Sequence, residues 1–335
     1  MQQPRPPTFI DLFCGAGGFT QGLKQAGWHH LLGIESDPVA AATYASNHEG
    51  RVLQKDVHHV TEQDVPEEEV DLVACSPPCQ SFSMAGKRKP GDARDNLWEQ
   101  ALRIAVLLCK AKWIVMENVP GLLSKKAEDD QKTPIMHLIR KKLRELGYHS
   151  EYRILNAADY GVPQARKRVF LVARHGFLTF GFPWPIPTHP KQIRSEPTPH
   201  IHFPEETTVR SILENREPAQ SYFLPAKTEA YFRRRLTERP CYVKVLTDLD
   251  KPAPTIRACY HGHRGQSALL PVEERLRMLT ERECARIQTF PEDYVFQTRQ
   301  EGKVGPIYHQ IGNAVPVRLA EAMGRALMTF FLSGS

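Results

Sequence analysis

In the first 180 residues, short apolar runs alternate with segments of helical spacing, and this alternation constrains the fold more than any other feature of the chain. A strand that is followed by a helix, repeated several times, is typical of a doubly wound, mostly parallel sheet with helices on both faces. The sequence therefore predicts an α/β fold for this half, with strands at 8–13, 31–35, 70–76, 112–119 and 168–174 and helices at 19–27, 37–48, 96–110 and 133–147.

The character of the sequence changes at about residue 180, where proline becomes frequent. Proline removes a backbone donor and restricts φ, so neither long helices nor central strands are expected there. Helical spacing returns over 273–290 and over 315–332. Since 335 residues exceed the usual size of one domain, we predict a second, smaller and irregular domain beyond this boundary.

The composition indicates a globular protein, because 41% of the residues are hydrophobic and 24% are charged. A net charge of +6 is compatible with a polyanionic partner, although many enzymes of unrelated function are equally basic. Seven cysteines, an odd number without a signal-like start, argue against a disulfide framework. With no apolar stretch of transmembrane length, we expect a protein of a reducing compartment and no membrane partner.

A glycine-rich turn, CGAGG, follows the first predicted strand and would let a ligand approach the backbone. The dinucleotide fingerprint G-x-G-x-x-G fits Gly15 and Gly17 but requires glycine where Thr20 stands, which weakens an NAD site. Glu35 could accept hydrogen bonds from a ribose, and Asp56 could meet an adenine amino group. The same residues are compatible with a simple tight turn and with a Glu35 that caps the next helix.

Two prolines, Pro77 and Pro78, stand directly before Cys79 and restrict the backbone at the end of a predicted strand. Ligands of parallel sheets bind at such strand ends, so this thiol is a candidate nucleophile. A free thiol has a pKa of about 8.5, and bringing it to ambient pH requires about 2 kcal/mol of differential stabilisation. A sulfur nucleophile suits a methyl acceptor that is an electron-poor ring carbon, since covalent addition beside that carbon generates an enamine.

The remaining cysteines are expected to be ordinary. A free cysteine is usually a small buried hydrophobic residue, and we predict this for Cys14, Cys109, Cys241, Cys259 and Cys284. The pair formed by Cys75 and Cys79 lacks a second pair at matching spacing, so no zinc or other metal site is predicted.

Six segments resemble the motifs of the DNA cytosine-5 methyltransferase family, in the family's order. They are FIDLFCGAGGF (9–19), PPCQSFSMAGK (77–87), MENVPGLL (116–123), DYGVPQARKRVFLVA (159–173), LTERECARIQTFPEDY (279–294) and QIGNAVP (310–316). The chain is most similar to prokaryotic members of the restriction-modification type. The resemblance implies transfer of a methyl group from S-adenosyl-L-methionine to carbon 5 of cytosine in a specific duplex DNA sequence, which leaves S-adenosyl-L-homocysteine.

The resemblance also assigns catalytic roles. Cys79 is similar to the nucleophile that adds to carbon 6 of a cytosine flipped out of the duplex. Glu117 is similar to the residue that holds and protonates the ring nitrogen, and Asn118 to one that braces this loop. Arg166 and Arg168 resemble the arginines that orient Glu117 and contact the base or its backbone, and they alternate along a predicted strand, so they are expected on one face.

Two binding sets follow from the same motifs. The resemblance implies that S-adenosyl-L-methionine is bound by Phe13, Gly15, Ala16, Gly18, Glu35, Ser36, Asp56, Val57, Pro78, Leu97, Asn313 and Val315. Ser36 departs from the family, which often has an apolar or aromatic residue there. The implied DNA contacts are Gln80, Ser83, Lys87, Arg94 and Gln164.

In family terms, the chain divides into a catalytic and cofactor-binding domain at 1–180, a target recognition domain with a hinge at 181–303, and a closing motif with a C-terminal helix at 304–335 that returns to the catalytic domain. The expected partner is double-stranded DNA, met in the cytoplasm at the nucleoid by a monomer with a cognate restriction endonuclease acting on the same site. A tRNA cytosine-5 methyltransferase of the same fold is the alternative, although its Cys-Phe-Thr signature is absent. A DNA-binding protein that has lost catalysis is a further alternative.

Overall fold

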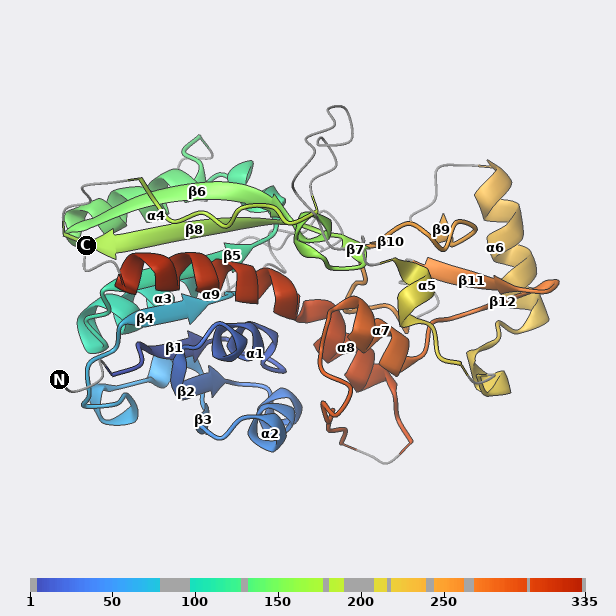
Figure 1. Ribbon diagram of the computed structural model, residues 1–335, viewed down its shortest axis with the longest axis horizontal. Helices are drawn as coiled ribbons and strands as arrows, with labels where there is room; N and C mark the ends of the chain where they lie inside the picture. The colour runs from blue at the N-terminus through green and yellow to red at the C-terminus, as the bar shows by residue number, and fades with distance from the viewer. Residues whose placement is uncertain are drawn as a thin grey trace. The chain divides into compact units, whose positions relative to one another are not determined.

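The computed structural model describes residues 5–78, 97–127, 132–176, 181–189, 208–215, 218–238, 244–261, 268–299 and 302–332. The chain forms two compact units (Figure 1). Unit 1 contains Met1–Leu155, Lys167–Ile186 and Ala320–Ser335, and unit 2 contains Asn156–Arg166 and Pro187–Leu319. Unit 2 therefore takes in a short insertion before residue 167 and extends to residue 319, whereas the sequence places functional boundaries at 180 and 303.

Unit 1 is built on a seven-stranded sheet with the order β3-β2-β1-β4-β5-β8-β6 (Figure 1). The neighbours from β3 to β5 are parallel, and β8 is antiparallel to β5, so the predicted mostly parallel α/β sheet is confirmed. The strands are β1 (Thr8–Leu12), β2 (His29–Glu35), β3 (Arg51–Gln54), β4 (Leu72–Cys75), β5 (Trp113–Asn118), β6 (Tyr148–Asn156) and β8 (Lys167–His175).

Helices of unit 1 cover both faces of this sheet (Figure 1). On one face, Ile10 and Leu12 belong to the same core cluster as residues of α3 and α4. On the other face, α9 lies against α1: the Trp28 indole donates to the carbonyl of Gly324 at 2.9 Å, and a Cβ on Gly324 would lie 2.8 Å from that of Ala26. The helical segments are α1 (Gly18–Gln25), α2 (Pro38–Asn47), α3 (Leu97–Leu102), α4 (Ile135–Glu145) and α9 (Val317–Leu332), with shorter turns η1 (Val57–His59), η2 (Glu62–Asp64), η4 (Arg103–Leu108) and η5 (Pro120–Leu123).

Local signals explain where these helices begin and end. Helix α2 starts at Pro38 behind an Asp37 cap, as its sequence predicts. Helix α1 ends before Gly27, whose φ of 92° lies in the left-handed region. The single helix predicted over 96–110 is wrong in detail, because α3 passes at Arg103 into the π-helix η4. The edge strand β6 was not predicted, since its polar residues give it no apolar run.

Unit 2 has short strands and helices of its own. Its small sheets have the orders β10-β7 and β12-β11-β9. The elements are η6 (Ala157–Tyr160), β7 (Gln164–Ala165), α5 (Val209–Ile212), η8 (Gln220–Tyr222), α6 (Ala226–Glu238), β9 (Lys244–Val245), β10 (Ala253–Pro254), β11 (Ala268–Val272), β12 (Arg275–Arg277), α7 (Glu281–Ile287) and α8 (Gly305–Asn313).

The helix predicted over 273–290 is wrong in its first half. Residues Arg275–Arg277 form β12, which pairs with β11, and α7 begins only at Glu281. A capping box explains this start, because the Thr280 hydroxyl accepts from the Glu283 N–H while the Glu283 carboxylate accepts from the Thr280 N–H. Helical spacing in LTERECARI was therefore real, but the residues before the cap belong to a strand.

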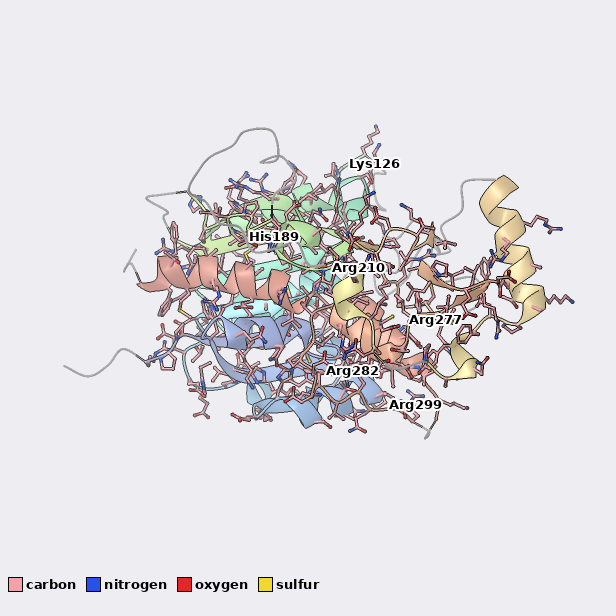
Figure 2. The ribbon with its side chains drawn as sticks, turned by 45° about the vertical axis from the view of Figure 1, so that its right-hand side comes forward. Lys126, His189, Arg210, Arg277, Arg282 and Arg299 are labelled. Carbon is pink, nitrogen blue, oxygen red and sulfur yellow. The ribbon has the colours of Figure 1, made fainter. Side chains whose placement is uncertain are left out.

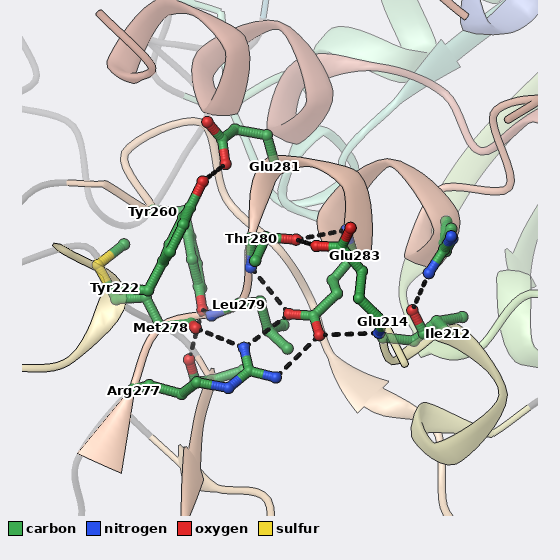
Figure 3. Close-up of polar contacts among 12 residues, drawn as sticks. Ile212, Glu214, Tyr222, Tyr260, Arg277, Met278, Leu279, Thr280, Glu281 and Glu283 are labelled. Atoms are coloured by element: carbon green, nitrogen blue, oxygen red, sulfur yellow. Dashed lines mark hydrogen bonds and ion pairs between the residues drawn. The ribbon is translucent and has the colours of Figure 1, made fainter. Parts of the chain in front are cut away.

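A buried ion pair ties β12 to α7 (Figure 3). The two terminal nitrogens of Arg277 donate to the two carboxylate oxygens of Glu283, each at 2.8 Å, and both residues are nearly inaccessible to solvent. The Thr280 hydroxyl in turn donates to Glu214 at 2.7 Å. Such a bidentate pair can be kept in the interior because its two parallel hydrogen bonds offset much of the cost of removing both charges from water.

The cysteine predictions are confirmed for Cys14, Cys109 and Cys284, which are buried, and wrong for Cys259, which is exposed. Cys241 lies outside the described residues. Within the described ranges, no helix is both long and apolar enough to cross a membrane, and no cluster of His, Cys, Asp and Glu could hold a metal ion.

Candidate functional site

The glycine-rich turn lies at the carboxyl end of β1 and has an unusual backbone. Phe13, Gly15 and Gly17 have positive φ values of 58°, 54° and 87°. A Cβ built on Gly15 would meet no atom of the described residues within 4 Å, so open space borders the backbone there. A turn that exposes its backbone beside a strand end can hold a ligand at close range.

Glu35, at the carboxyl end of β2, faces this turn. One carboxylate oxygen accepts the N–H of Gly15 at 2.9 Å, and the other accepts the N–H of Asp37 at 2.8 Å. The alternative that Glu35 caps the next helix is wrong, because the Asp37 side chain does so, accepting from the N–H groups of Val39 and Ala40. Glu35 therefore links the glycine-rich turn to the start of α2.

Asp56 follows β3 and caps the turn η1. Its carboxylate accepts the N–H of His58 at 2.9 Å and contacts the His58 ring at 2.7 Å. These contacts, the backbone hydrogen bond first, lower the pKa of Asp56, which keeps its exposed side chain ionised. Val57 and Leu97 are both buried in the core cluster of unit 1.

The other predicted cofactor residues of unit 1 surround the same strand ends. Phe13 and Pro78 are half-buried and Ser36 is exposed. Ala16 and Gly18 are buried. Strand ends β1, β2 and β4 thus bring these residues to one edge of the sheet, as a parallel sheet requires.

Beneath the turn lies a buried carboxylate that the sequence did not single out. Asp11 is fully buried, and one of its oxygens accepts the Thr20 hydroxyl at 2.7 Å. Desolvation raises the pKa of Asp11 to about 7. Thr20 also contacts the Tyr44 hydroxyl at 2.8 Å, so the residue that replaces the third fingerprint glycine joins a buried polar network.

Glu117 and Arg168 form an ion pair at the carboxyl end of β5. Arg168 Nε lies 2.9 Å from Glu117 Oε1, and about nine-tenths of each side chain is buried. The antiparallel register of β5 and β8 makes this possible, because it sets Glu117 opposite Phe170, two residues from Arg168. The structure therefore brings together two of the predicted catalytic residues.

Asn118 links the same strand end to the proline turn. Its side-chain amide donates to the carbonyl of Pro77 at 3.1 Å, and its oxygen accepts the N–H of Val119 at 2.9 Å. Ser76 ties the turn to β1 by donating its N–H to the Leu12 carbonyl at 3.2 Å. The chain that leads to Cys79 is thus fixed up to Pro78; Cys79, Gln80, Ser83, Lys87 and Arg94 themselves lie outside the described residues.

Gln164 and Arg166 belong to unit 2, and both are buried. Arg166 donates to three carbonyls, those of Ile256 at 2.8 Å, Gly312 at 2.9 Å and Ala314 at 3.2 Å. The Gln164 amide oxygen accepts the N–H of Ile256 at 2.9 Å. Burial along 164–168 alternates as predicted, yet Arg166 reaches backbone of unit 2 whereas Arg168 reaches Glu117.

Gln288 completes this arrangement, and sequence reasoning missed it. Its side chain accepts from Gln164 at 2.9 Å and donates to the carbonyls of Ile311 and Ala314 at 2.7 and 3.2 Å. We call Gln164, Arg166 and Gln288 the polar clamp. The polar clamp binds backbone carbonyls of the segment 311–314. Two predicted cofactor residues lie in or next to this segment: Asn313, which is exposed, and Val315, which is buried. The one sequence signal for Gln288 was its position as a polar residue directly after the helix α7, whose Cys284, Ala285 and Ile287 are buried.

Several arginines of unit 2, among them the labelled Arg210, Arg277 and Arg282 of Figure 2, make intramolecular contacts. Arg282 donates to the carbonyls of Pro291 and Tyr294, and Arg210 forms an exposed ion pair with Asp250. Arg277 is held by Glu283. The number of arginines in unit 2 therefore overstates how many of them are available to bind a phosphate.

The sequence model of the C-5 cytosine-specific DNA methylase family matches residues 7–329. The chain belongs to that family. Among curated relatives, the Type II methyltransferase M1.HphI of Haemophilus parahaemolyticus is 33% identical over 346 residues, which cover 96% of this chain and 86% of that protein. The Type II methyltransferase M.NgoMIV of Neisseria gonorrhoeae is 34% identical, covering 96% of this chain and 97% of that protein.

Solved structures agree on the fold. A mutant of Spodoptera frugiperda DNMT2 superposes with a TM-score of 0.73 at 22% identity, covering 96% of this chain and 99% of that one. S. pombe Dnmt2 gives 0.72 at 20% identity, with 98% and 99% covered. The chain has the methyltransferase fold, and its family membership makes it a DNA (cytosine-5-)-methyltransferase.

Proposed function

We propose that this methylase modifies cytosine at carbon 5 within a specific duplex DNA sequence, through a covalent adduct between Cys79 and a base flipped out of the helix. The observation that carries the proposal is the pair formed by Glu117 and Arg168, which lies one residue from the Asn118 amide that holds the carbonyl of Pro77. Strand β5 therefore carries both the Glu117 carboxylate, which Arg168 holds, and Asn118, which supports the turn before Cys79.

The residues at the strand ends fit S-adenosyl-L-methionine. Glu35 offers a half-buried carboxylate as an acceptor for ribose hydroxyls, and the positive-φ turn around Gly15 borders open space, in which a Cβ would stand. Asp56 and Val57 follow the next strand along, where an adenine would be recognised. When bound, this cofactor supplies an electrophilic methyl group. We assign to it the set named from the sequence, including Asn313 and Val315.

Each protein group then has a defined task. The Cys79 thiolate adds to carbon 6 of cytosine, while Glu117 protonates the ring nitrogen and so offsets the negative charge that this addition creates. Carbon 5 would take the methyl group, which leaves S-adenosyl-L-homocysteine. A base then removes the proton from carbon 5, elimination returns the electron pair to Cys79, and the ring nitrogen gives its proton back to Glu117. Arg168 holds Glu117 in place by an ion pair, and Asn118 holds the turn that carries the thiol.

A duplex substrate requires the target nucleotide to leave the base stack, which costs a few kcal/mol. We propose that Gln80, Ser83, Lys87 and Arg94 contact DNA around the extruded base. Unit 2, whose strands are short, is the proposed target recognition region, with phosphate contacts for affinity and a few side chains for base edges. We propose that the protein acts as a monomer and, because its relatives are named Type II methyltransferases, that a restriction endonuclease acts on the same site.

The test is a pair of measurements on Cys79→Ser. We expect methyl transfer from labelled S-adenosyl-L-methionine to plasmid DNA to be lost, while DNA and cofactor binding survive. Wild-type protein should form a covalent complex with duplex DNA that contains 5-fluorocytosine at the target, because elimination needs a proton that fluorine replaces. Near wild-type methylation by Cys79→Ser would overturn the covalent mechanism.

Substrate class is tested separately. Bisulfite sequencing of plasmid from cells that express the protein reads the modified sequence directly, and parallel assays on duplex DNA and on tRNA compare the two acceptors. Methylation of tRNA without methylation of DNA would contradict the duplex substrate. DNA binding should also weaken steeply with salt, since phosphate contacts release counterions.

A further inference from the structure

A π-helix interrupts unit 1 next to the proposed cofactor site. Segment η4 follows α3 without a break, and the N–H of Cys109 donates to the carbonyl of Ile104 at 2.9 Å, five residues back. The N–H of Ala111 donates to Ala105 at 3.0 Å. π-Helical turns are rare and occur often at functional sites, so the residue at which this one begins, Arg103, is of interest.

Arg103 makes three directed hydrogen bonds. Its Nε donates to the Gln100 side chain at 2.8 Å, and its two terminal nitrogens donate to the carbonyls of Val60 at 3.0 Å and Val57 at 2.9 Å. Val57 and Val60 are both buried, so their carbonyls lie at the edge of a hydrophobic core. The guanidinium thus holds both ends of the turn η1.

The contacts of Arg103 matter because η1 and α3 carry residues of the proposed cofactor site. Asp56 caps η1, Val57 is its first residue, and Leu97 is the first residue of α3. All three belong to the residues proposed above for S-adenosyl-L-methionine. Arg103 contacts none of their side chains in the described structure, but it connects the two elements that present them.

We propose that Arg103 is a positioning residue for the adenosine part of the cofactor: by holding the two carbonyls of η1 against the α3–η4 helix, it sets Asp56 and Val57 in register with Leu97. The inference rests on the proposed use of S-adenosyl-L-methionine. Lysine could not replace this side chain, because a single ammonium cannot span two carbonyls and an amide as a planar guanidinium does.

The test measures binding of S-adenosyl-L-homocysteine by calorimetry. Arg103→Met should weaken binding about tenfold, equivalent to about 1.4 kcal/mol. Arg103→Lys should also lose affinity. The KM for DNA and the rate at saturating S-adenosyl-L-methionine should change by less than about twofold, because the substitution leaves the chemical step untouched.

Arg140→Met is the matched control. Arg140 also lies on a helix of unit 1, α4, and donates to a backbone carbonyl, that of Ser150 on β6, at 3.1 Å. It is remote in sequence from every proposed cofactor residue. We expect it to lower the unfolding temperature without changing affinity for S-adenosyl-L-homocysteine, which separates a general loss of stability from a loss of positioning.

A double-mutant cycle supplies the second readout. Because Arg103 acts through the turn that Asp56 caps, the binding penalties of Arg103→Met and Asp56→Asn should be less than additive. Additive penalties, or equal losses in Arg103→Met and Arg140→Met, would overturn the inference. If Arg103→Met does not fold, the cycle with Arg103→Lys decides. Wild-type protein that binds no S-adenosyl-L-homocysteine would instead refute the proposed function.

Discussion

Two arginines, separated by one residue, behave differently in the two units. Arg168, in unit 1, pairs with the Glu117 carboxylate at the carboxyl end of β5. Arg166, in unit 2, is 2% exposed and donates to three backbone carbonyls. One guanidinium orients a group that the proposed chemistry uses, whereas the other satisfies the backbone of its own unit.

The difference reflects how each unit is held together. In unit 1, strands of four to nine residues form a continuous ladder of backbone hydrogen bonds, so side chains at the strand ends remain available for a ligand. In the described part of unit 2 the ladders are short: β7, β9 and β10 have two residues each, and β11 pairs with β12 over three residues. Buried amide and guanidinium groups, such as the polar clamp, take over that role.

The largest expected effect tests the chemical side of this comparison. Glu117→Gln should reduce methyl transfer by about 10⁴-fold, because an amide cannot protonate the ring nitrogen, while the isosteric side chain leaves the fold intact. Labelled methyl transfer measures the rate, and chemical denaturation measures stability. Glu151→Gln is the control, since Glu151 forms an exposed ion pair with Arg153. An active Glu117→Gln would remove the proposed role of this carboxylate.

The next effect tests the structural side. Arg166→Met should lower the free energy of unfolding by about 5 kcal/mol, because it removes a buried guanidinium and leaves the buried carbonyls of Ile256 and Gly312 without this donor. Urea denaturation monitored by fluorescence measures the loss. Arg168→Met should instead lose methyl transfer. Its cost in stability should be smaller than that of Arg166→Met, because it leaves one carboxylate, which can take up a proton, without its partner. The contrast between the two arginines is wrong if Arg168→Met is the less stable variant and Arg166→Met the one that loses methyl transfer without losing stability.

Unit 1 was predictable from sequence to a larger extent than unit 2. Strand β1 and helix α2 match their predicted ranges closely, because an apolar run with a glycine turn and an Asp-Pro start are local signals. Helix α8 and the clamp residue Gln288 were not predicted, since their structure depends on partners more than 20 residues away. Arg166 and Arg168 carry the same chemical pattern, and only tertiary structure separates them.

A smaller effect concerns pH and the buried carboxylate of unit 1. The pKa of Asp11 is about 7 in the folded protein against an ordinary value of 3.8, so the folded state retains a proton that the unfolded chain releases between these values. Relative to Asp11→Asn, the wild type should therefore lose about 3 kcal/mol of stability as pH rises from 4 to 7, and a few tenths of a kcal/mol more before the loss levels off at about pH 8.

Two buried histidines titrate in the same range with the opposite sign. Desolvation lowers the pKa of His30 to about 4 and that of His48 to about 3, so each favours folding as pH rises toward 6.5. Both are present in the wild type and in Asp11→Asn, and their contributions cancel in the difference. Urea denaturation of the two proteins at half-unit steps from pH 4 to 8 measures it. A constant difference would mean that Asp11 is ionised throughout.

The smallest expected effect tests whether a residue takes part in cofactor binding simply because it lies close to the strand ends. Asp37 lies two residues from Glu35, and its carboxylate accepts the N–H groups that begin α2, at 2.9 and 3.0 Å. Asp37→Ala should therefore cost about 1 kcal/mol of stability, and Asp37→Asn much less, because the amide oxygen still caps the helix. Affinity for S-adenosyl-L-homocysteine should be unchanged in both, since the backbone N–H of Asp37 that Glu35 holds remains. A loss of affinity in Asp37→Ala that Asp37→Asn restores would show that the capped start of α2 holds Glu35 in position. Helix α2 would then belong to the cofactor site and not only to the scaffold of unit 1.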